Sequence, residues 1–527
     1  MRRRRLASRV VGALSAAALS ACSVGPDFLQ PKAPEQAGYT PETLAPQTSS
    51  ADVAGGAAQR FLQAEDIPGQ WWTLFHSATL NALIEEGLKA NPDLAAAQAA
   101  LRQANELAYA DQGALFPTLS ASGSATREKV SIASPGGVIV GPGGTTSGLP
   151  PLSLTTASLS VSYAADVFGG TRRQIESAEA QAAYERFQLE AIYLTFTSNA
   201  VNTAVTLASV HEQIKVTEDL IKILTDEVAV VQGRLDAGTA SKADVLSQQS
   251  QLAQTKATLP PLQKQLVQAR NQLMAYVGRF PNQDQGESFD LSSLSLPEAL
   301  PVSLPSKLVE QRPDVTASAA QLHEASANIG VAIANQLPQF SITGQLGDSS
   351  GGFDKLFNPG TLLWNIGGSI TQTIFDGGTL EHRKRAAVAA YDQAAAQYRS
   401  TVLTAFQDVA NALRALQTDA DTLEAQALAE RAALESLDVS REQYRLGAAD
   451  IFTLLNAEQT YQTAVLNRVR AQAARYSDTA ALFQALGGGW WNRNDVAPEA
   501  AGTPDRFVLP PFQEVRLARL QRTSSRD

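Results

Sequence analysis

Four segments of this 527-residue chain alternate between apolar residues and small polar or amide residues. In one of them, for example, Leu159, Val161 and Tyr163 are separated by single residues that are mostly serine. Alternation with a period of two predicts strands that have one apolar and one polar face. The predicted strands are residues 118–129, 154–167, 339–347 and 362–375. Strands of about ten residues suit a lipid-facing sheet, but the alternation alone fits a one-sided sheet in a soluble protein equally well.

Two long segments, residues 171–236 and 379–445, contain no proline and are rich in alanine, glutamine and leucine. At 1.5 Å per residue, each predicts a helix of roughly 100 Å. Each ends at a glycine-containing turn, around Gly238 or Gly447, after which a second helix returns. Apolar residues in the first segment are spaced by three and four positions, as in a coiled coil. They are Ile221, Leu224, Val228, Val231 and Leu235.

The chain carries this pattern twice. The stretch "NPDLAAAQAALRQANELAYADQGALFPTLSASG" aligns without gaps with "RPDVTASAAQLHEASANIGVAIANQLPQFSITG". Further on, "FGGT" matches "FDGGT", and "DAGTASKADVL" matches "RLGAADIFTLL". Each copy therefore predicts a helix, two strands around a loop, and two long antiparallel helices. The first copy has a longer loop rich in glycine and proline, and Pro260-Pro261 is expected to break or kink its returning helix.

The chain begins with an arginine cluster, a short apolar run and small residues, which is the layout of a secretory signal peptide. The residues "LSAC" that end at Cys22 resemble the bacterial lipobox. This resemblance implies cleavage before Cys22, a lipid on its thiol and acylation of the new amino terminus. The alternative is an incidental cysteine in an ordinary signal peptide. Ser23 follows instead of aspartate, so no inner-membrane retention signal of that type is visible.

Composition excludes several classes of function. The formal charge of −10 argues against a nucleic-acid partner. Cys22 is the only cysteine, and the 4 histidines have no metal-ligand spacing, so no metal or cofactor is expected. The sequence shows no nucleophile–base pair and no phosphate-binding loop that would indicate an enzyme. No apolar run after the signal is long enough for a transmembrane helix, so a chain that crosses a membrane has to do so as a closed β-barrel. Four strands are too few for one, which requires several chains to share it.

Five motifs, in order, resemble the outer membrane factor (TolC-type) family, and within it the NodT-like lipoprotein subunits of resistance-nodulation-division (RND) efflux systems. The motifs are "CSVGPDF", "WWTLFHSATLNALIEEGLKANPDL", "LPSKLVEQRPDV", "FDGG" and "YRLGAADIFTLLNAEQ". The resemblance implies an α+β fold in a homotrimer. The trimer would have a shared twelve-strand outer-membrane β-barrel, a coiled-coil helical barrel in the periplasm and a small equatorial domain.

The resemblance also implies a function and partners. The chain would be the passive exit duct of a tripartite efflux pump, anchored in outer membrane lipid. A periplasmic adaptor protein and an inner-membrane RND-type pump would complete the assembly. Two alternatives stay open, which are a duct for type I protein secretion and a coiled-coil envelope lipoprotein without a channel.

The expected organisation follows from the motifs and the duplication. Residues 1–21 form the signal peptide, and residues 22–75 form a lipid-anchored N-terminal segment. Residues 76–285 and 286–490 form the two outer-membrane-efflux repeats. Residues 491–527 form a C-terminal tail.

The predicted functional positions lie near the two glycine turns. Gly238 and Thr239 in the first turn, and Gly447 and Ala448 in the second, would form adaptor-docking tips. The resemblance implies this role, whereas the residues alone indicate only a structural helix–turn–helix.

The resemblance also implies a periplasmic gate, made by bonds between neighbouring coiled coils. Asp244 and Tyr444 match gate positions, and a hydrogen bond from the Tyr444 hydroxyl to the Asp244 carboxylate is expected in the closed state. Asp450 and Arg441 lie close by and are further candidates, because an arginine found in some family members aligns with Ala449. An acidic ring of some members aligns with uncharged Thr453 and Asn456.

Overall fold

The structure is a computed structural model of the chain. It describes residues 23–36, 38–42, 44–129, 138–140, 146–148 and 151–493, with only the backbone for residues 138–140 and 146–148. Cys22, the predicted signal peptide and residues 494–527 lie outside the described residues. The boundaries predicted for the five regions of the chain stay predictions.

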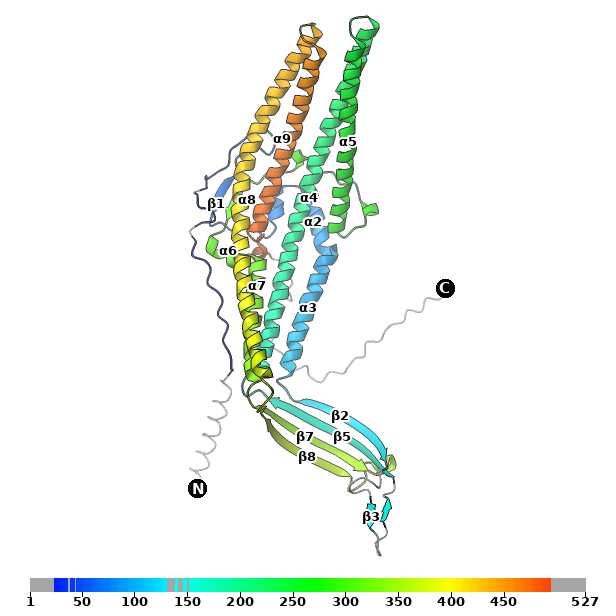
Figure 1. The fold of residues 1–527 in the computed structure, drawn as a ribbon, viewed down its shortest axis with the longest axis vertical. Coiled ribbons are helices and arrows are strands. Elements are labelled where there is room, and N and C mark those ends of the chain that lie inside the picture. Colours follow the sequence, from blue (N-terminus) through cyan, green and yellow to red (C-terminus); the bar gives the residue numbers. More distant parts are fainter. Residues whose placement is uncertain are drawn as a thin grey trace, which may run out of the picture.

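Long helices form an elongated bundle, and an extended sheet continues from one end of it (Figure 1). The helices are α2 (Ala78–Ala90), α3 (Pro92–Gly113), α4 (Gly170–Asp236), α5 (Lys242–Tyr276), α6 (Pro305–Gln311), α7 (Pro313–Ala334), α8 (Thr379–Arg445) and α9 (Ile451–Ala485). The strands are β1 (Arg60–Gln63), β2 (Thr118–Glu128), β3 (Val138–Val140), β4 (Thr146–Gly148), β5 (Leu152–Ala165), β6 (Ala299–Val302), β7 (Gln339–Ser350) and β8 (Leu362–Thr371). Within the described part of the chain, no helix is both long and apolar enough to span a membrane.

The predicted duplication is confirmed at the level of whole elements. Helices α3 and α7 each have 22 residues, and each begins with a proline, which suits a first helical turn that has no intrahelical partner for its N–H groups. Helices α4 and α8 each have 67 residues, and α5 and α9 each have 35. The main difference between the copies is the longer connection between β2 and β5, which contains the small β3–β4 hairpin.

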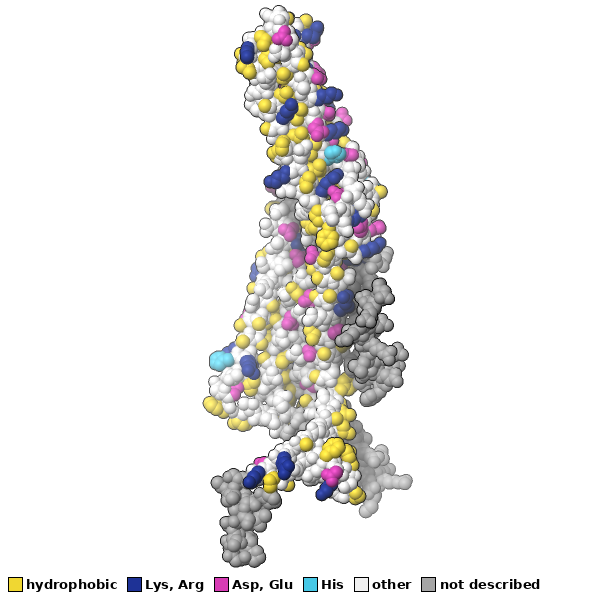
Figure 2. Space-filling model, turned by 90° about the vertical axis from the view of Figure 1, so that its right-hand side faces the viewer, with side chains coloured by type: hydrophobic (Ala, Val, Ile, Leu, Met, Phe, Trp, Pro, Cys, Tyr) yellow, Lys and Arg dark blue, Asp and Glu magenta, His cyan; other side chains and the backbone are white. Residues whose placement is uncertain are grey.

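The four predicted strands form one antiparallel sheet in the order β2-β5-β7-β8. The register places apolar residues opposite one another: Leu159 pairs with Leu346, which in turn pairs with Trp364. These side chains remain largely exposed, with 49% of Leu159 and 71% of Trp364 accessible, because no described element covers the apolar face. Hydrophobic side chains gather along the sheet in Figure 2. The sheet therefore leaves one broad apolar face without a protein partner.

The opposite face of the sheet is polar and is hydrogen-bonded across the strands. The hydroxyl groups of Ser122 and Ser158 are hydrogen-bonded to each other, with 3.1 Å between the two oxygen atoms. Gln345 donates to the Ser158 hydroxyl and accepts from Asn365, at 3.1 and 3.0 Å. The period-two alternation of the sequence thus separates an apolar face from a polar ladder, as predicted.

The helices pair as two hairpins, α4–α5 and α8–α9, which lie side by side along the bundle (Figure 1). Leu224 and Val231 of the predicted coiled-coil seam are fully buried. Helix α5 runs uninterrupted through Pro260-Pro261, so the break expected there is wrong, whereas the kink expected as its alternative stays a prediction. Both prolines are exposed, so the backbone carbonyls that lose an intrahelical donor lie on the solvent side, where water can satisfy them.

The main core lies around the middle of the bundle. The motif "WWTLF" forms a short 3-10 helix, Trp71–Phe75, whose Trp71, Trp72 and Phe75 are buried. Trp71 stacks on Phe483 of α9, with ring centroids 5.2 Å apart. Beside this core, β1 pairs in parallel with β6, so the N-terminal region joins the second repeat directly. This packing explains why the motif is dense in aromatic residues.

Replacement of the central tryptophan tests this core. Trp71→Ala removes a fully buried indole and should lower the free energy of unfolding by about 3–5 kcal/mol. Denaturation of the detergent-solubilised protein, followed by circular dichroism, measures the change. Phe353→Ala is the control, because Phe353 is 80% exposed, and it should shift stability by less than about 0.5 kcal/mol. Equal shifts for the two variants would contradict the assignment of the core.

Candidate functional site

Both predicted tips are built as the same turn. At the end of α4, Gly238 has φ 72°, its N–H donates to the Leu235 carbonyl at 2.9 Å, and Thr239 N–H donates to the Arg234 carbonyl at 2.8 Å. These two hydrogen bonds end a helix through a residue in the left-handed conformation, and this conformation favours glycine.

The turn after α8 repeats this geometry. Gly447 has φ 75°, its N–H donates to the Tyr444 carbonyl at 3.1 Å, and Ala448 N–H donates to the Gln443 carbonyl at 2.8 Å. The glycine and the residue after it are exposed at both tips. The tips are therefore accessible in the described chain, and their role in docking stays a prediction.

Two of the predicted gate residues cap the returning helices. The Asp244 carboxylate accepts from the backbone N–H of Ser241 at 2.8 Å, while the Ser241 hydroxyl accepts from the Asp244 N–H at 3.1 Å. Asp450 caps α9 by accepting from both the N–H and the hydroxyl of Thr453, at 2.8 and 2.7 Å. These hydrogen bonds from Thr453 hold the pKa of Asp450 below its ordinary value. Both aspartates thus have a local structural role at the tips.

Tyr444 lies between the two hairpins. Its ring lies under the Arg234 guanidinium of α4, with 4.7 Å between the ring centroid and Cζ. The ring also packs against an apolar tip cluster, which we define as Val231, Val245, Leu437, Ile451 and Leu454. Within this chain the Tyr444 hydroxyl does not bond to Asp244, whose carboxylate already caps α5. The gate role of this pair stays a prediction.

A layer of buried and half-buried polar side chains lies next to the tip cluster. We call it the polar layer; it consists of Glu227 of α4, Gln248 of α5, Arg441 of α8 and Glu458 of α9. Gln248 donates to Glu227 at 3.1 Å, and the Arg441 guanidinium lies 3.7 Å from the Glu227 carboxylate. Sequence reasoning named Arg441 but missed the other three. The missed signal is that Gln248 and Glu458 occupy coiled-coil seam positions, three residues after Val245 and four after Leu454.

At the other end of the helices, the repeated "GGT" motifs connect a strand of the sheet to the long helix that follows it: β5 to α4, and β8 to α8. Gly169 and Gly378 have φ 76° and 89° and precede α4 and α8 directly. Asp166 accepts from the first backbone N–H groups of α4, and Asp376 does the same for α8. The motif therefore supplies both the left-handed turn and the helix cap at the junction of sheet and helices.

The motif "CSVGPDF" is explained by a clamp at this same junction. The side chain of Arg173, which is 4% exposed, donates to the carbonyls of Val24 and Gly25 and to the Asp27 carboxylate, at 3.1, 3.4 and 2.7 Å. Glu176 holds the same guanidinium at 2.7 Å. These contacts fix the first described residues after Cys22 beside the start of α4.

From this clamp, an N-terminal strap runs along the outside of the helices to β1 (Figure 1). We define the strap as the described residues between 23 and 59. Tyr39 donates to the Ser303 carbonyl at 2.9 Å, and Ser49 donates to Asp421 of α8 at 2.7 Å. The strap is therefore attached at several points to the second repeat.

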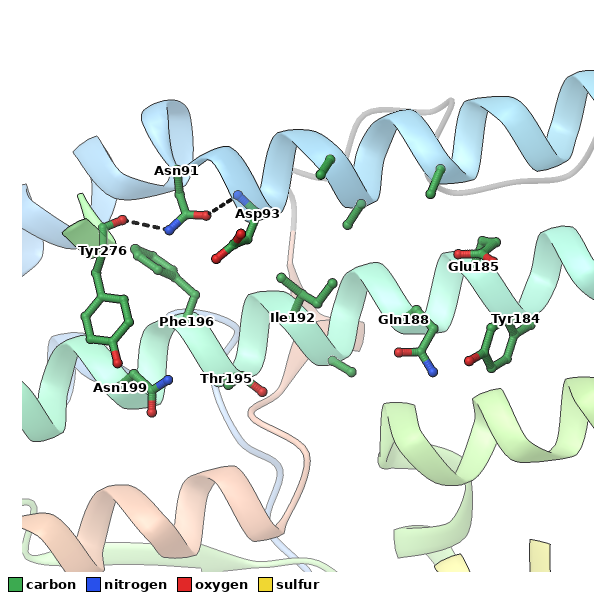
Figure 3. Close-up of a pocket in the computed structure, with 14 residues that line it drawn as sticks. Asn91, Asp93, Tyr184, Glu185, Gln188, Ile192, Thr195, Phe196, Asn199 and Tyr276 are labelled. Carbon is green, nitrogen blue, oxygen red and sulfur yellow. Dashed lines mark hydrogen bonds between the residues drawn. The ribbon is translucent and has the colours of Figure 1, made fainter. Parts of the chain in front are cut away.

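One groove of the bundle is lined mainly by α3 and α4 (Figure 3). Asn91 caps α3 by accepting from Asp93 N–H at 2.8 Å, and it donates to the Tyr276 carbonyl at 2.8 Å. Small and apolar side chains form most of the lining, and no histidine, cysteine, serine or lysine belongs to it. Among the described residues, no group of acidic, histidine or cysteine side chains could hold a metal ion. The groove offers no arrangement for bond chemistry.

A substitution at Gly25 tests whether the clamp requires glycine at this position. A Cβ on Gly25, which has φ 98°, would lie 2.5 Å from the Gly330 backbone, so Gly25→Ala should release residues 23–28. Amide hydrogen exchange of this segment should rise at least tenfold. Gly286→Ala is the matched control, because Gly286 has φ 78° with open space around it. Unchanged protection of the segment in Gly25→Ala would contradict the clamp.

Known proteins resemble this chain over most of its length. The pyoverdine export outer membrane protein OpmQ of Pseudomonas aeruginosa is 29% identical over 430 residues, which cover 81% of this chain and 88% of OpmQ. The toluene efflux pump outer membrane protein TtgC of Pseudomonas putida is 29% identical over 492 residues, covering 93% and 97%. The structure of the outer-membrane channel OprN superimposes with a TM-score of 0.78 at 27% identity, covering 89% of this chain and all of OprN. The TolC-like fold and the outer-membrane location expected from the sequence are confirmed.

The sequence model of the outer membrane efflux protein family matches two stretches of the chain, residues 83–279 and 304–488. These stretches correspond to the two structural repeats, from α2 to the end of α5 and from α6 to just beyond α9. The match covers well over half of the chain. The chain therefore belongs to the outer membrane efflux protein family.

Proposed function

We propose that this protein is the passive exit duct of a tripartite efflux pump for small molecules. The observation that carries the proposal is the sheet, which combines an uncovered apolar face, a polar opposite face and two unpaired edge strands. Lipid is the natural partner of the apolar face in an outer-membrane protein, and water is the partner of the polar ladder. The duct itself does no bond chemistry and needs no cofactor.

The edges of the sheet support assembly as a homotrimer. Among the described strands, β2 pairs only with β5 and β8 pairs only with β7, so both outer edges carry backbone groups without a strand partner in this part of the chain. Such edges are costly in lipid, and four strands cannot close on themselves. Three copies that join β8 to the β2 of a neighbour give a closed sheet of twelve strands. The same symmetry surrounds a central passage with the long helices.

The clamp at Arg173 supports a lipid anchor on Cys22. Residues 24, 25 and 27 are fixed at the junction between the sheet and the helices, and this junction coincides with the membrane surface if the apolar face lies in lipid. An acyl chain on Cys22 would start within a few residues of that surface. The anchor then adds to the membrane attachment that the sheet provides.

The cargo and the partners are inferred from the relatives. OpmQ is named for pyoverdine export and TtgC for toluene efflux, so similar chains serve chemically different small molecules. This favours a duct whose cargo is selected elsewhere, by an inner-membrane RND-type pump that a periplasmic adaptor links to the tips. A protein-secretion duct has the same fold but no observation in its favour, and an envelope lipoprotein without a channel leaves the sheet unexplained.

The gate prediction is tested in planar lipid bilayers with the purified protein. Tyr444→Phe removes the hydroxyl that is expected to bond to Asp244 of a neighbouring coiled coil, so the closed-state conductance should rise several-fold. The variant keeps an aromatic ring under Arg234. Tyr444→Leu removes both features and serves as the comparison. If only the leucine variant leaks, the ring contact holds the gate and the Tyr444–Asp244 pair is wrong.

The anchor is tested by Cys22→Ala, made with a signal peptide that is cleaved without a lipidated cysteine. Membrane sorting and assembly should weaken by at least threefold, because one membrane attachment is lost. Conductance of each assembled channel should stay at the wild-type value, because the closed sheet forms the pore. Fractionation and single-channel recording measure the two properties. An assembled variant that no longer conducts would contradict this division of roles.

A further inference from the structure

The polar layer is unusual because each of the four long helices contributes one buried or half-buried side chain to it. Glu458 is 1% exposed and Gln248 is fully buried, whereas Glu227 and Arg441 are half-buried. The layer joins the α4–α5 hairpin to the α8–α9 hairpin beside the apolar tip cluster. Any motion that separates the hairpins near their tips has to open this layer.

Hydrogen bonding in the layer is incomplete if both glutamates are ionised. Neither carboxylate oxygen of Glu458 has a donor within hydrogen-bond distance, although both are buried. Gln248 gives its amide N–H to Glu227, and Arg441 approaches Glu227 at 3.7 Å, which is too long for a hydrogen bond. Nε and Nη2 of Arg441 also have no acceptor. One cation therefore faces one buried and one half-buried carboxyl group.

A proton supplies the donor that is missing between the two carboxyl groups. Burial, followed by a hydrogen bond to Glu227 and the negative charge of Glu227, raises the pKa of Glu458 to about 9. With that proton, Glu458 donates to Glu227, and the pair carries a single negative charge beside Arg441. Without it, a second charge would be buried with no donor, which costs far more than a neutral carboxyl group.

We propose that the polar layer is a proton-binding latch that holds the two helical hairpins together below their tips. The bound proton lies between the carboxyl groups of Glu458 and Glu227. Gln248 and Arg441 orient Glu227 to receive it. Loss of the proton favours separation of the hairpins, so the latch links proton binding to the opening of the tip. This inference goes beyond the duct function and does not depend on the cargo.

The other ionisable groups near the layer do not supply this proton. Glu430 and Arg468 pair with each other at 2.8 Å. Tyr461 of α9 stays neutral, since burial raises its pKa, and Asp438 of α8 acts on it only through its charge. Helix α5 contributes only the uncharged Gln248 to the layer. The proton therefore belongs to the pair Glu227–Glu458.

The direction of the pH dependence follows from the two states. In the separated state the carboxyl group of Glu458 meets water and has its ordinary pKa of about 4.3. Between that value and about 9, the closed state of Glu458 holds one proton more than the open state. The opening equilibrium should then rise by up to about tenfold per pH unit, and it should level off above this range. The latch is tight in acid and loosens in base.

Amide hydrogen exchange of the full-length assembled protein in detergent tests the latch. The peptides to follow are the tip halves of α4, α5, α8 and α9, with rates corrected for the intrinsic dependence of exchange on pH. From pH 6 to pH 8, the opening equilibrium of the wild type should rise by up to about 100-fold. Glu458→Gln keeps a donor for Glu227 but cannot titrate, so its opening should change less than threefold.

Two further variants make the test specific. Glu442→Gln removes an exposed glutamate of α8, next to Arg441 in the sequence, which bonds to Arg445, and should keep the wild-type slope. Glu227→Gln removes the second carboxyl group and its charge, so the pH range over which opening rises should narrow; burial alone still raises the pKa of Glu458. A wild-type slope that survives in Glu458→Gln, or a flat wild type, would overturn the proposal. Exchange reports the tip alone, so either result leaves the conductance test of the duct unaffected.

Discussion

Backbone hydrogen bonding at the edges of the four-stranded sheet is the constraint on which the rest of this structure depends. Within the described residues, strands β2 and β8 each lack a partner on one side, and nothing covers the apolar face of the sheet. In lipid, such edges require strands from further chains. The tandem repeat widens the sheet and the helical bundle together, because each copy contributes one pair of strands and one helical hairpin. Sheet and helices thereby acquire the same symmetry.

The sequence predicted the strands, the order of the elements and the glycine turns, because each of these has a local pattern that occurs twice in the chain. Alternation in residues such as Leu159 and Val161 gave the faces of the strands, and the gapless match of the two copies gave the order of elements. The glycine turns were readable because only a left-handed residue closes both helices in this way. Even the caps at Asp244 and Asp450 follow from short-range spacing, although the sequence suggested a gate instead.

The parts that could not be predicted are contacts between residues far apart in the chain. Arg173 binds carbonyl groups of Val24 and Gly25 that nothing near it in the sequence indicates. Glu458 was not singled out because it is a charged residue on a helix, and the packing of four helices places it in the interior. Pro260 failed as a helix breaker for the complementary reason, because packing against α4 keeps α5 together and the lost hydrogen bonds face solvent. In each case the outcome depends on whether the residue is buried or exposed, and only the folded structure determines that.

The strap gives this protein a particular order of folding. Gln59 bonds to Thr479, 420 positions later, and Thr48 accepts from Arg475, 427 positions later. A chain exported from its N-terminus delivers the strap first, yet the surface that receives Thr48 and Gln59 exists only after almost the whole second repeat has followed. The residues that leave the cell interior earliest must therefore settle last, after a long loop has closed. During that interval the strap stays exposed to periplasmic proteases, so its cleavage in incomplete chains would mark how far assembly has progressed.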